Sequence, residues 1–185
     1  MQIKMDKAAV REIEATLNHI KNGSSRAMAS AINHTLGVTR TEASSEIRKQ
    51  VKLKAAYVRK RLKPEKASVT RPEGRITTPK RGILGTRFPH RHYARGGMGL
   101  QIKPTGGYER MPGAWIMRFP NGQQAIVFRP SDQSQINWEK AGLRVVYGPS
   151  VSQVFTDVKD DLQAPSGERL IARMQHEAER LIARQ

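Results

Sequence analysis

Apolar residues recur at helical spacing near the start of the chain. Val10, Ile13, Leu17 and Ile20 form a stripe with charged residues between them, which predicts an amphipathic helix ending at the Asn-Gly pair that follows. The opening stretch "MQIKMDKAAVREIEATL" is mixed in charge and has no apolar run. We therefore expect neither a signal peptide nor a membrane span.

Two further helices are expected before residue 64. The second is predicted to be capped by Ser24 or Ser25, and Gly37 is a point where it could be interrupted. Its Ala-rich apolar face consists of Met28, Ala31, Ile32, Ala43, Ile47 and Val51. The stretch "LKAAYVRKRL" (53–62) predicts a third, shorter helix that stops before Pro64, because the residue preceding a proline disfavours the α region.

Between about residues 64 and 148 the pattern changes to prolines, glycines and β-branched residues. The sequence "FPNGQQ" contains Asn-Gly, the pair typical of a two-residue hairpin turn in which both central residues have positive φ. We therefore predict a hairpin between the third and fourth of five candidate strands. These strands are 67–71, 99–104, 114–119, 125–130 and 143–147.

The chain ends in a helical pattern. Ser150 and Gln153 have the spacing of a capping box, followed by an apolar face of Val151, Val154, Phe155, Val158 and Leu162. Pro165 is expected to end this helix and Ser166 to begin the last one. The apolar stripe of that last helix is Leu170, Ile171, Met174, Ala178, Leu181 and Ile182.

Together these patterns predict one α+β domain over residues 1–185, with N-terminal helices, a central antiparallel β-sheet with a long basic loop, and C-terminal helices. Its parts are an N-terminal helical part (1–63), a basic extended segment (64–98), a β-rich part (99–148) and the C-terminal helices (149–185). Apolar residues make up only 37% of the chain, so we expect a small core.

The charge of the chain is strongly unbalanced. The formal net charge is +17 and the pI is near 10.8, so the surface should attract polyanions. From Arg48 to Arg95 there are sixteen Lys or Arg against only Glu65 and Glu73. We expect this window to contact either nucleic-acid phosphates or an acidic protein. The expected contact residues are Arg48, Lys49, Lys52, Lys54, Arg59, Lys60, Arg61, Lys63, Arg71, Arg75, Lys80, Arg81, Arg87, Arg91 and Arg95.

No catalytic motif is complete in the sequence. "HEAER" begins like a helical zinc-protease motif, but Arg180 stands where the second histidine is needed. His90 and His92 could share one side of a strand and bind a metal, although without cysteine or a nearby carboxylate a plain loop pair is favoured. Ser150 lacks the flanking glycines of a nucleophile elbow, and we interpret it as a helix cap. No cofactor is expected.

Two other motifs have simple structural interpretations. Asp157, Asp160 and Asp161 have helical spacing, and we interpret them as the polar face of an amphipathic helix; a metal-dependent nuclease site is the competing interpretation. "RGGMG" (95–99) is not followed by the Lys-Ser/Thr of a phosphate loop, so it is interpreted as a turn entering a strand.

Two stretches carry a resemblance to a known family. They are "EIRKQVKLKAAYVRKRL" (46–62) and "LRVVYGPSVSQVF" (143–155), and both resemble the phage minor tail protein Z family, the tail-completion proteins of tailed bacteriophages and prophages. The order of the other parts is also similar, including "GAWIM" and "VFRP" in the β-rich middle. The likeness spans most of residues 24–185.

The resemblance implies a structural virion protein and no enzyme activity. Family members join the head-proximal end of the tail late in assembly and make the tail competent for head joining and for placement of the DNA end. The positions matching the late family motif are Tyr147, Gly148, Pro149, Ser150, Val151 and Phe155. Those matching the early motif are Arg48, Lys49, Leu53, Tyr57 and Val58.

From the resemblance we expect the chain to form a ring, six-fold to match the tail tube, assembled in the host cytoplasm and located in the tail or neck of the virion. Its expected partners are other copies of itself, the tail terminator, tube and connector proteins, and genomic DNA in the channel, but no membrane. The alternative is an accessory protein that binds nucleic acid without sequence preference, because the charge alone would suit that role.

Overall fold

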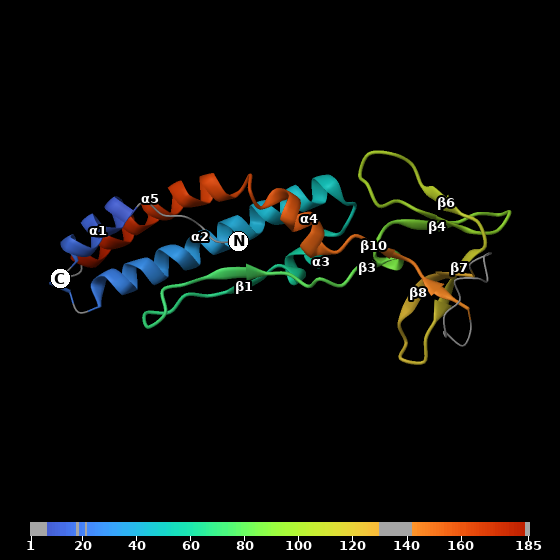
Figure 1. Ribbon diagram of the computed structural model, residues 1–185, viewed down its shortest axis with the longest axis horizontal. Helices are drawn as coiled ribbons and strands as arrows, with labels where there is room; N and C mark the ends of the chain where they lie inside the picture. The colour runs from blue at the N-terminus through green and yellow to red at the C-terminus, as the bar shows by residue number, and fades with distance from the viewer. Residues whose placement is uncertain (1–6, 18, 21, 130–141, 184–185) are drawn as a thin grey trace.

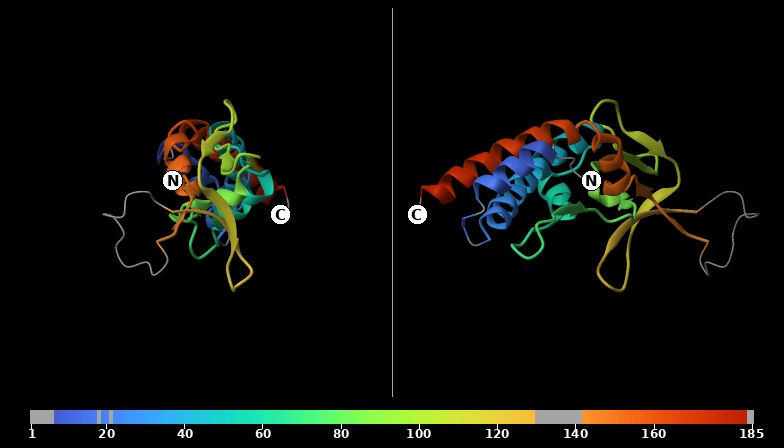
Figure 2. Two further views of the ribbon diagram at one scale, coloured as in Figure 1. Left: turned by 90° about the vertical axis from the view of Figure 1, so that its right-hand side faces the viewer. Right: turned by 60° about the vertical axis from the view of Figure 1, so that its left-hand side comes forward.

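The computed structural model describes residues 7–17, 19, 20, 22–129 and 142–183, without side chains before Arg11. It is an elongated α+β structure with the helices and the hairpin of residues 63–77 at one end and the other small sheets at the other (Figures 1 and 2). Residues 1–6, 130 and the side chain of Val10, which figure in the sequence predictions, lie outside the described part. None of the described helices is both long and apolar enough to cross a bilayer.

The helical end is formed by segments from both ends of the chain. Long helices α2 and α5 run side by side, α1 packs on them, and α3 and α4 lie toward the sheets (Figure 1). The helices are α1 (Lys7–Thr16), α2 (Gly23–Gln50), α3 (Ala55–Arg61), α4 (Val151–Val158) and α5 (Gln163–Ile182). All five predicted helices are therefore present.

Polar contacts tie α2 to α5. The Thr39 and Ser166 hydroxyls are hydrogen-bonded at 2.8 Å, with both residues buried. Arg169 makes a bidentate ion pair with Glu42, its two nitrogens donating at 2.7 and 3.0 Å. Fork-to-fork geometry of this kind fixes orientation as well as distance, so these contacts set the register of the two helices.

Several predicted helix boundaries are wrong, among them the end of the first helix, which is Thr16, and the start of the last, which is Gln163 and not Ser166. Neither Ser24 nor Ser25 caps α2, because both serines lie inside its first turn. The N-cap is Asn22, whose backbone is in the left-handed region (φ 56°), a conformation that asparagine tolerates. Gly37 does not interrupt α2. Pro165 does not end a helix; it lies in the first turn of α5, where its missing N–H costs nothing.

The strands form four small antiparallel sheets, where the sequence predicted one central sheet. The pairings are β1 with β2, β3 with β10, β4–β5–β6 and β7–β8–β9. The strands are β1 (Lys63–Glu65), β2 (Arg75–Thr77), β3 (Ile83–Leu84), β4 (His90–His92), β5 (Met98–Leu100), β6 (Glu109–Met111), β7 (Ala114–Arg118), β8 (Gln124–Phe128), β9 (Arg144–Val145) and β10 (Tyr147–Gly148). A 3-10 turn, η1 (Gly85–Arg87), follows β3.

The predicted hairpin over 114–130 is confirmed as β7–β8, but its turn differs from the prediction. The Gly122 N–H donates to the Phe119 carbonyl at 2.9 Å, and the Phe119 N–H donates to Gln123 at 2.8 Å. Only Gly122 has positive φ (77°), whereas Asn121 does not. The turn is therefore a type I turn that runs from Phe119 to Gly122, with Pro120 at its second position and a bulge at Gly122, not a two-residue turn with two positive φ angles.

The strand predicted at 67–71 is wrong, and the side chain of Asn33 explains why. The Ala67 N–H donates to Asn33 Oδ1 at 2.9 Å, and Asn33 Nδ2 donates to the Ala67 carbonyl at 3.0 Å. Both backbone groups that a strand partner would use are thus occupied. The segment becomes the loop between β1 and β2.

Other strand predictions are partly correct. Of 99–104, only the start is in β5. Pro89, which lies opposite Gln101, accepts from the Gln101 N–H but has no N–H of its own to return the second bond of the ladder. The strand at 143–147 is split into β9 and β10 at Val146, whose N–H donates to Ile126 of β8. The predicted turn at 95–99 is confirmed, since it leads from β4 into β5 with Gly96 and Gly97 at positive φ.

One hydrophobic cluster extends from the helices into the sheets. It contains Ile47 and Val58 from the N-terminal helices, Phe155 from α4 and Ile126 from β8. The segment 64–98, predicted to be basic and extended, contains β2, β3, η1 and β4 and contributes the buried Phe88 to this core. The exposed cations of this segment therefore stand on an ordered framework.

Candidate interaction site

All fifteen predicted contact cations are exposed at the surface. Three have acidic partners: Lys49 with Glu46, Arg71 with Glu73 and Arg75 with Glu65. For the other twelve, no Asp or Glu within 4.0 Å is found in the described part of the chain. Exposed cations without acidic neighbours are available to an external polyanion.

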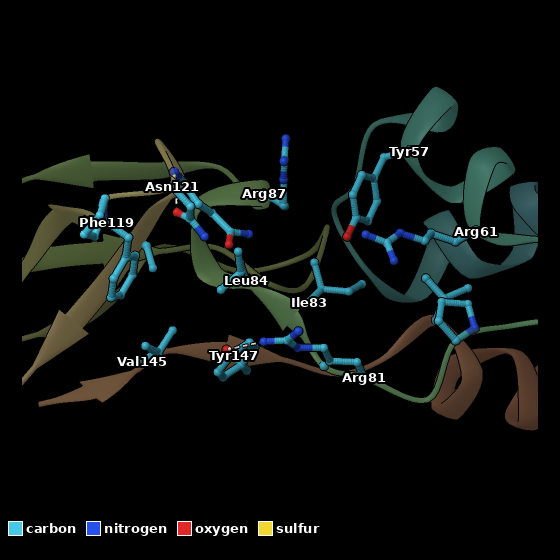
Figure 3. Close-up of a pocket in the computed structure, with 16 residues that line it drawn as sticks. Tyr57, Arg61, Arg81, Ile83, Leu84, Arg87, Phe119, Asn121, Val145 and Tyr147 are labelled. Atoms are coloured by element: carbon cyan, nitrogen blue, oxygen red, sulfur yellow. Dashed lines mark hydrogen bonds between the residues drawn. The ribbon is translucent and has the colours of Figure 1, made fainter. Parts of the chain in front are cut away.

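Part of this charge lines a cleft between the helical end and the sheets. The cleft has a volume of about 510 Å³ and is bordered by α3, the segment from Pro79 through η1, the β7–β8 turn and β9–β10 (Figure 3). Arg61, Arg81 and Arg87 line it, and no Asp or Glu does among the described residues. We call it the arginine cleft.

Tyr57 holds two of these arginines. The Arg61 and Arg87 guanidinium carbons lie 5.1 and 5.8 Å from the centre of its ring, within the range of cation–π attraction. Arg87 comes from η1, thirty residues beyond Tyr57 in sequence, so this contact joins α3 to the sheet end. The two positive charges are fixed at the edge of the cleft.

Tyr147 faces the same cleft from β10. Its side chain is 43% exposed, and its hydroxyl accepts a hydrogen bond from Arg81 Nη2 at 3.4 Å. Figure 3 shows Arg81 reaching toward Tyr147 on one side of the cleft, opposite Tyr57 and Arg61. The structure thus brings together one residue of the early family motif (Tyr57) and one of the late motif (Tyr147).

The rest of the late motif serves the fold. Gly148 lies against the buried ring of Phe88, where an added Cβ would be 2.6 Å from Phe88 Cε2. Pro149 is half-buried beside it, and Val151 and Phe155 are in the core. Ser150 is confirmed as a capping-box residue, since its hydroxyl accepts from the Gln153 N–H and its own N–H donates to Gln153 Oε1.

A second cluster of arginines and tyrosines lies on the β4–β5–β6 sheet. Arg91, Gly99 and Arg110 are directly paired across its three strands. Tyr93 lies over the bare Gly99, with Arg91 4.8 Å and Arg110 5.2 Å from its ring centre. Arg91 also lies 4.5 Å from the Tyr108 ring centre. The sequence analysis missed this cluster because strands β4 and β6 were not predicted.

The remaining candidate residues do not form a catalytic arrangement. His90 and His92 lie on strand β4, not in a loop, and His90 Nδ1 is 2.9 Å from the Phe88 carbonyl. Glu177 of "HEAER" is buried between Arg173 and Arg180, at 2.6 and 2.7 Å. Among the residues the structure describes, no three His, Cys, Asp or Glu gather where they could hold a metal ion.

A second groove of about 690 Å³ lies between α2, α5 and the β1–β2 hairpin. Its arginines, Arg71 and Arg75, are the ones paired with glutamates. The arginine cleft therefore has the stronger uncompensated positive charge of the two.

The exposed cations and the arginine cleft give the chain a surface that can attract an anionic macromolecule. Comparison with known families makes this specific. The family model for prophage minor tail protein Z matches residues 3–184, so the chain belongs to that family and is a structural protein of a phage tail. Neither a curated protein nor a solved structure was found to match the chain.

Proposed function

We propose that the chain is a tail-completion protein at the head-proximal end of the tail, in the neck of the virion, where it helps to join the head and to position the DNA end. In this proposal it assembles in the host cytoplasm as a ring of six copies. Its neighbours are the tail terminator, the tube and the connector.

The observation that carries the proposal is the exposed positive charge between residues 48 and 95, which this tail protein presents on ordered strands and helices. Twelve of the fifteen cations from Arg48 to Arg95 have no acidic partner among the described residues, and they stand on a framework of strands and helices. A protein at the top of a DNA-conducting tube needs a surface for neighbouring subunits and one compatible with DNA. The long helices and this charge suit these two needs.

Deleting the gene in the phage or prophage that encodes the chain tests the proposal. We expect tails of normal length that fail to yield infectious particles, because the tail is built but not completed. Purified chain added to such tails and filled heads should restore infectivity. Fully infectious particles without the chain would contradict the proposal.

The exposed cations also favour a second candidate, a nucleic-acid-binding accessory protein without sequence preference. Such a protein should bind free duplex tightly at physiological salt. The logarithm of its association constant should fall linearly with the logarithm of the salt concentration, with a slope of about −0.9 for each phosphate contact. For a tail-completion protein we expect weak binding of free duplex, because its binding surface is completed only in the assembly. Fluorescence anisotropy with labelled duplex over a salt series separates the two candidates.

A further inference from the structure

Three exposed aspartates match the three arginines of the cleft in number and carry the opposite charge. Asp157 lies in α4, and Asp160 and Asp161 lie in the turn between α4 and α5; all three are exposed. They lie close together along the chain, at the end of α4 and in the turn that follows it. We call them the aspartate face. In the described part of the chain no cation lies within 4.0 Å of these carboxylates.

Local stability does not explain the whole aspartate face. Asp160 and Asp161 precede α5, where negative charge favours the helix N-terminus, but Asp157 lies in the last turn of α4, where negative charge is unfavourable. The valines of α4, Val154 and Val158, are buried in the core, whereas all three aspartates are exposed. The aspartates are therefore accessible from outside their own subunit.

The aspartate face and the arginine cleft are not paired with each other within one copy. Among the described residues, no ion pair joins one of the three aspartates to one of the three cleft arginines. In Figure 1 the α4–α5 connection lies at the upper edge of the helical end, whereas the β7–β8 turn, one of the segments that border the cleft, lies at the lower edge. Each surface is therefore available to the complementary surface of another copy.

We propose that the arginine cleft of one copy receives the aspartate face of the next. This inference rests on the ring proposed above and names the contact that builds it. The contact joins two different surfaces, so it propagates from copy to copy and closes into a ring when the rotation allows. Each copy then contributes its cleft to one neighbour and its aspartate face to the other, with three charges on each surface.

The shape and lining of the cleft favour a protein segment over duplex DNA. The cleft is concave, and Ile83, Leu84 and Val145 supply apolar lining beside the arginines. Ion pairs that form beside apolar groups are less screened than pairs in open water. A duplex presents a convex row of phosphates, which fits the open surface carrying the other exposed cations better than a cleft.

Charge reversal in two variants tests the contact. One variant carries R61E, R81E and R87E, and the other carries D157K, D160K and D161K. Each variant alone should have a self-association constant at least about 100-fold lower than that of the unmodified chain, because like charges then meet across the contact. A one-to-one mixture should restore assembly, since the reversed cleft of one variant fits the reversed face of the other. The readout is sedimentation velocity at low salt, with the chain alone and bound to tails lacking it.

A matched control carries K103E, R118E and R129E, three exposed cations that lie outside the cleft and outside residues 48–95, and should assemble like the unmodified chain. Circular dichroism and thermal melting verify that every variant folds. The proposed contact is wrong if the reversed variants assemble normally, or if the mixture does not restore assembly. Neither result would contradict the ring itself. If the cleft variant alone loses duplex binding, the cleft serves DNA. If the unmodified chain stays monomeric even on tails, the ring and this contact both fall.

Discussion

Gly148 is the residue whose identity follows most directly from packing. An added Cβ would lie 2.6 Å from the Phe88 ring, which is 1% exposed and cannot move into solvent. We expect Gly148→Ala to reduce the free energy of unfolding by about 1–3 kcal/mol, the usual cost of overpacking a core. Denaturant unfolding of the purified protein measures this change.

Gly37 provides the matched control for Gly148→Ala. It lies inside α2, and an added Cβ would meet nothing within 4 Å. Gly37→Ala should therefore raise the stability by about 0.5–1 kcal/mol, because alanine loses less backbone entropy than glycine in a helix. Equal effects of the two substitutions would contradict the assigned role of Phe88.

Ser150 is the second residue with a specific structural role. Its hydroxyl and backbone N–H both bond to Gln153, at 3.0 and 2.8 Å, and the residue is buried. Ser150→Ala should cost about 0.5–2 kcal/mol of stability through loss of the cap, whereas Ser150→Thr should retain most of it. A Ser150→Ala variant as stable as the unmodified protein would show that the cap is not needed.

At the scale of elements, the predictable parts are those whose signals are local. The α4 capping box needs residues three positions apart, and the β7–β8 hairpin joins two five-residue strands through a short turn. Strands of two or three residues, such as β3 and β6, are too short to show a period of two. Their positions depend on partners far away, as for β3 with β10.

The same limit applies to the interaction site. The exposed charge between residues 48 and 95 could be predicted, because composition alone reveals it. The arginine cleft could not, since the Arg81–Tyr147 contact spans 66 residues and Tyr57 meets Arg87 only in the folded chain. No local pattern in the sequence encodes these contacts.

Asn33 gives a testable case at this scale. Its amide holds the loop between β1 and β2 through two hydrogen bonds to Ala67, at 2.9 and 3.0 Å. Asn33→Ala should cost about 1–3 kcal/mol, because the Ala67 backbone groups lose their partners. Hydrogen exchange should rise in residues 66–74 more than elsewhere; unchanged exchange there would contradict the assignment.

At the scale of the whole molecule, the subunit is elongated (Figure 1), and the exposed cations run from the end of α2 and from α3 into the strands of residues 63–95. The prediction that residues 1–185 form one domain, with parts at 1–63, 64–98, 99–148 and 149–185, is tested by limited proteolysis, which should give no stable fragment that corresponds to one part alone. The aspartate face and the arginine cleft are different surfaces of the subunit, and no ion pair joins them among the described residues, so the subunit is compatible with head-to-tail assembly.

Cryo-electron microscopy of the head–tail junction in purified particles tests the central claim most directly. The account predicts a ring of this chain at the top of the tail tube, with the arginine cleft of each copy against the aspartate face of its neighbour and the remaining cations toward DNA or a neck protein. Absence of the chain from mature particles, together with tight duplex binding in solution, would contradict this account and favour the accessory nucleic-acid-binding role.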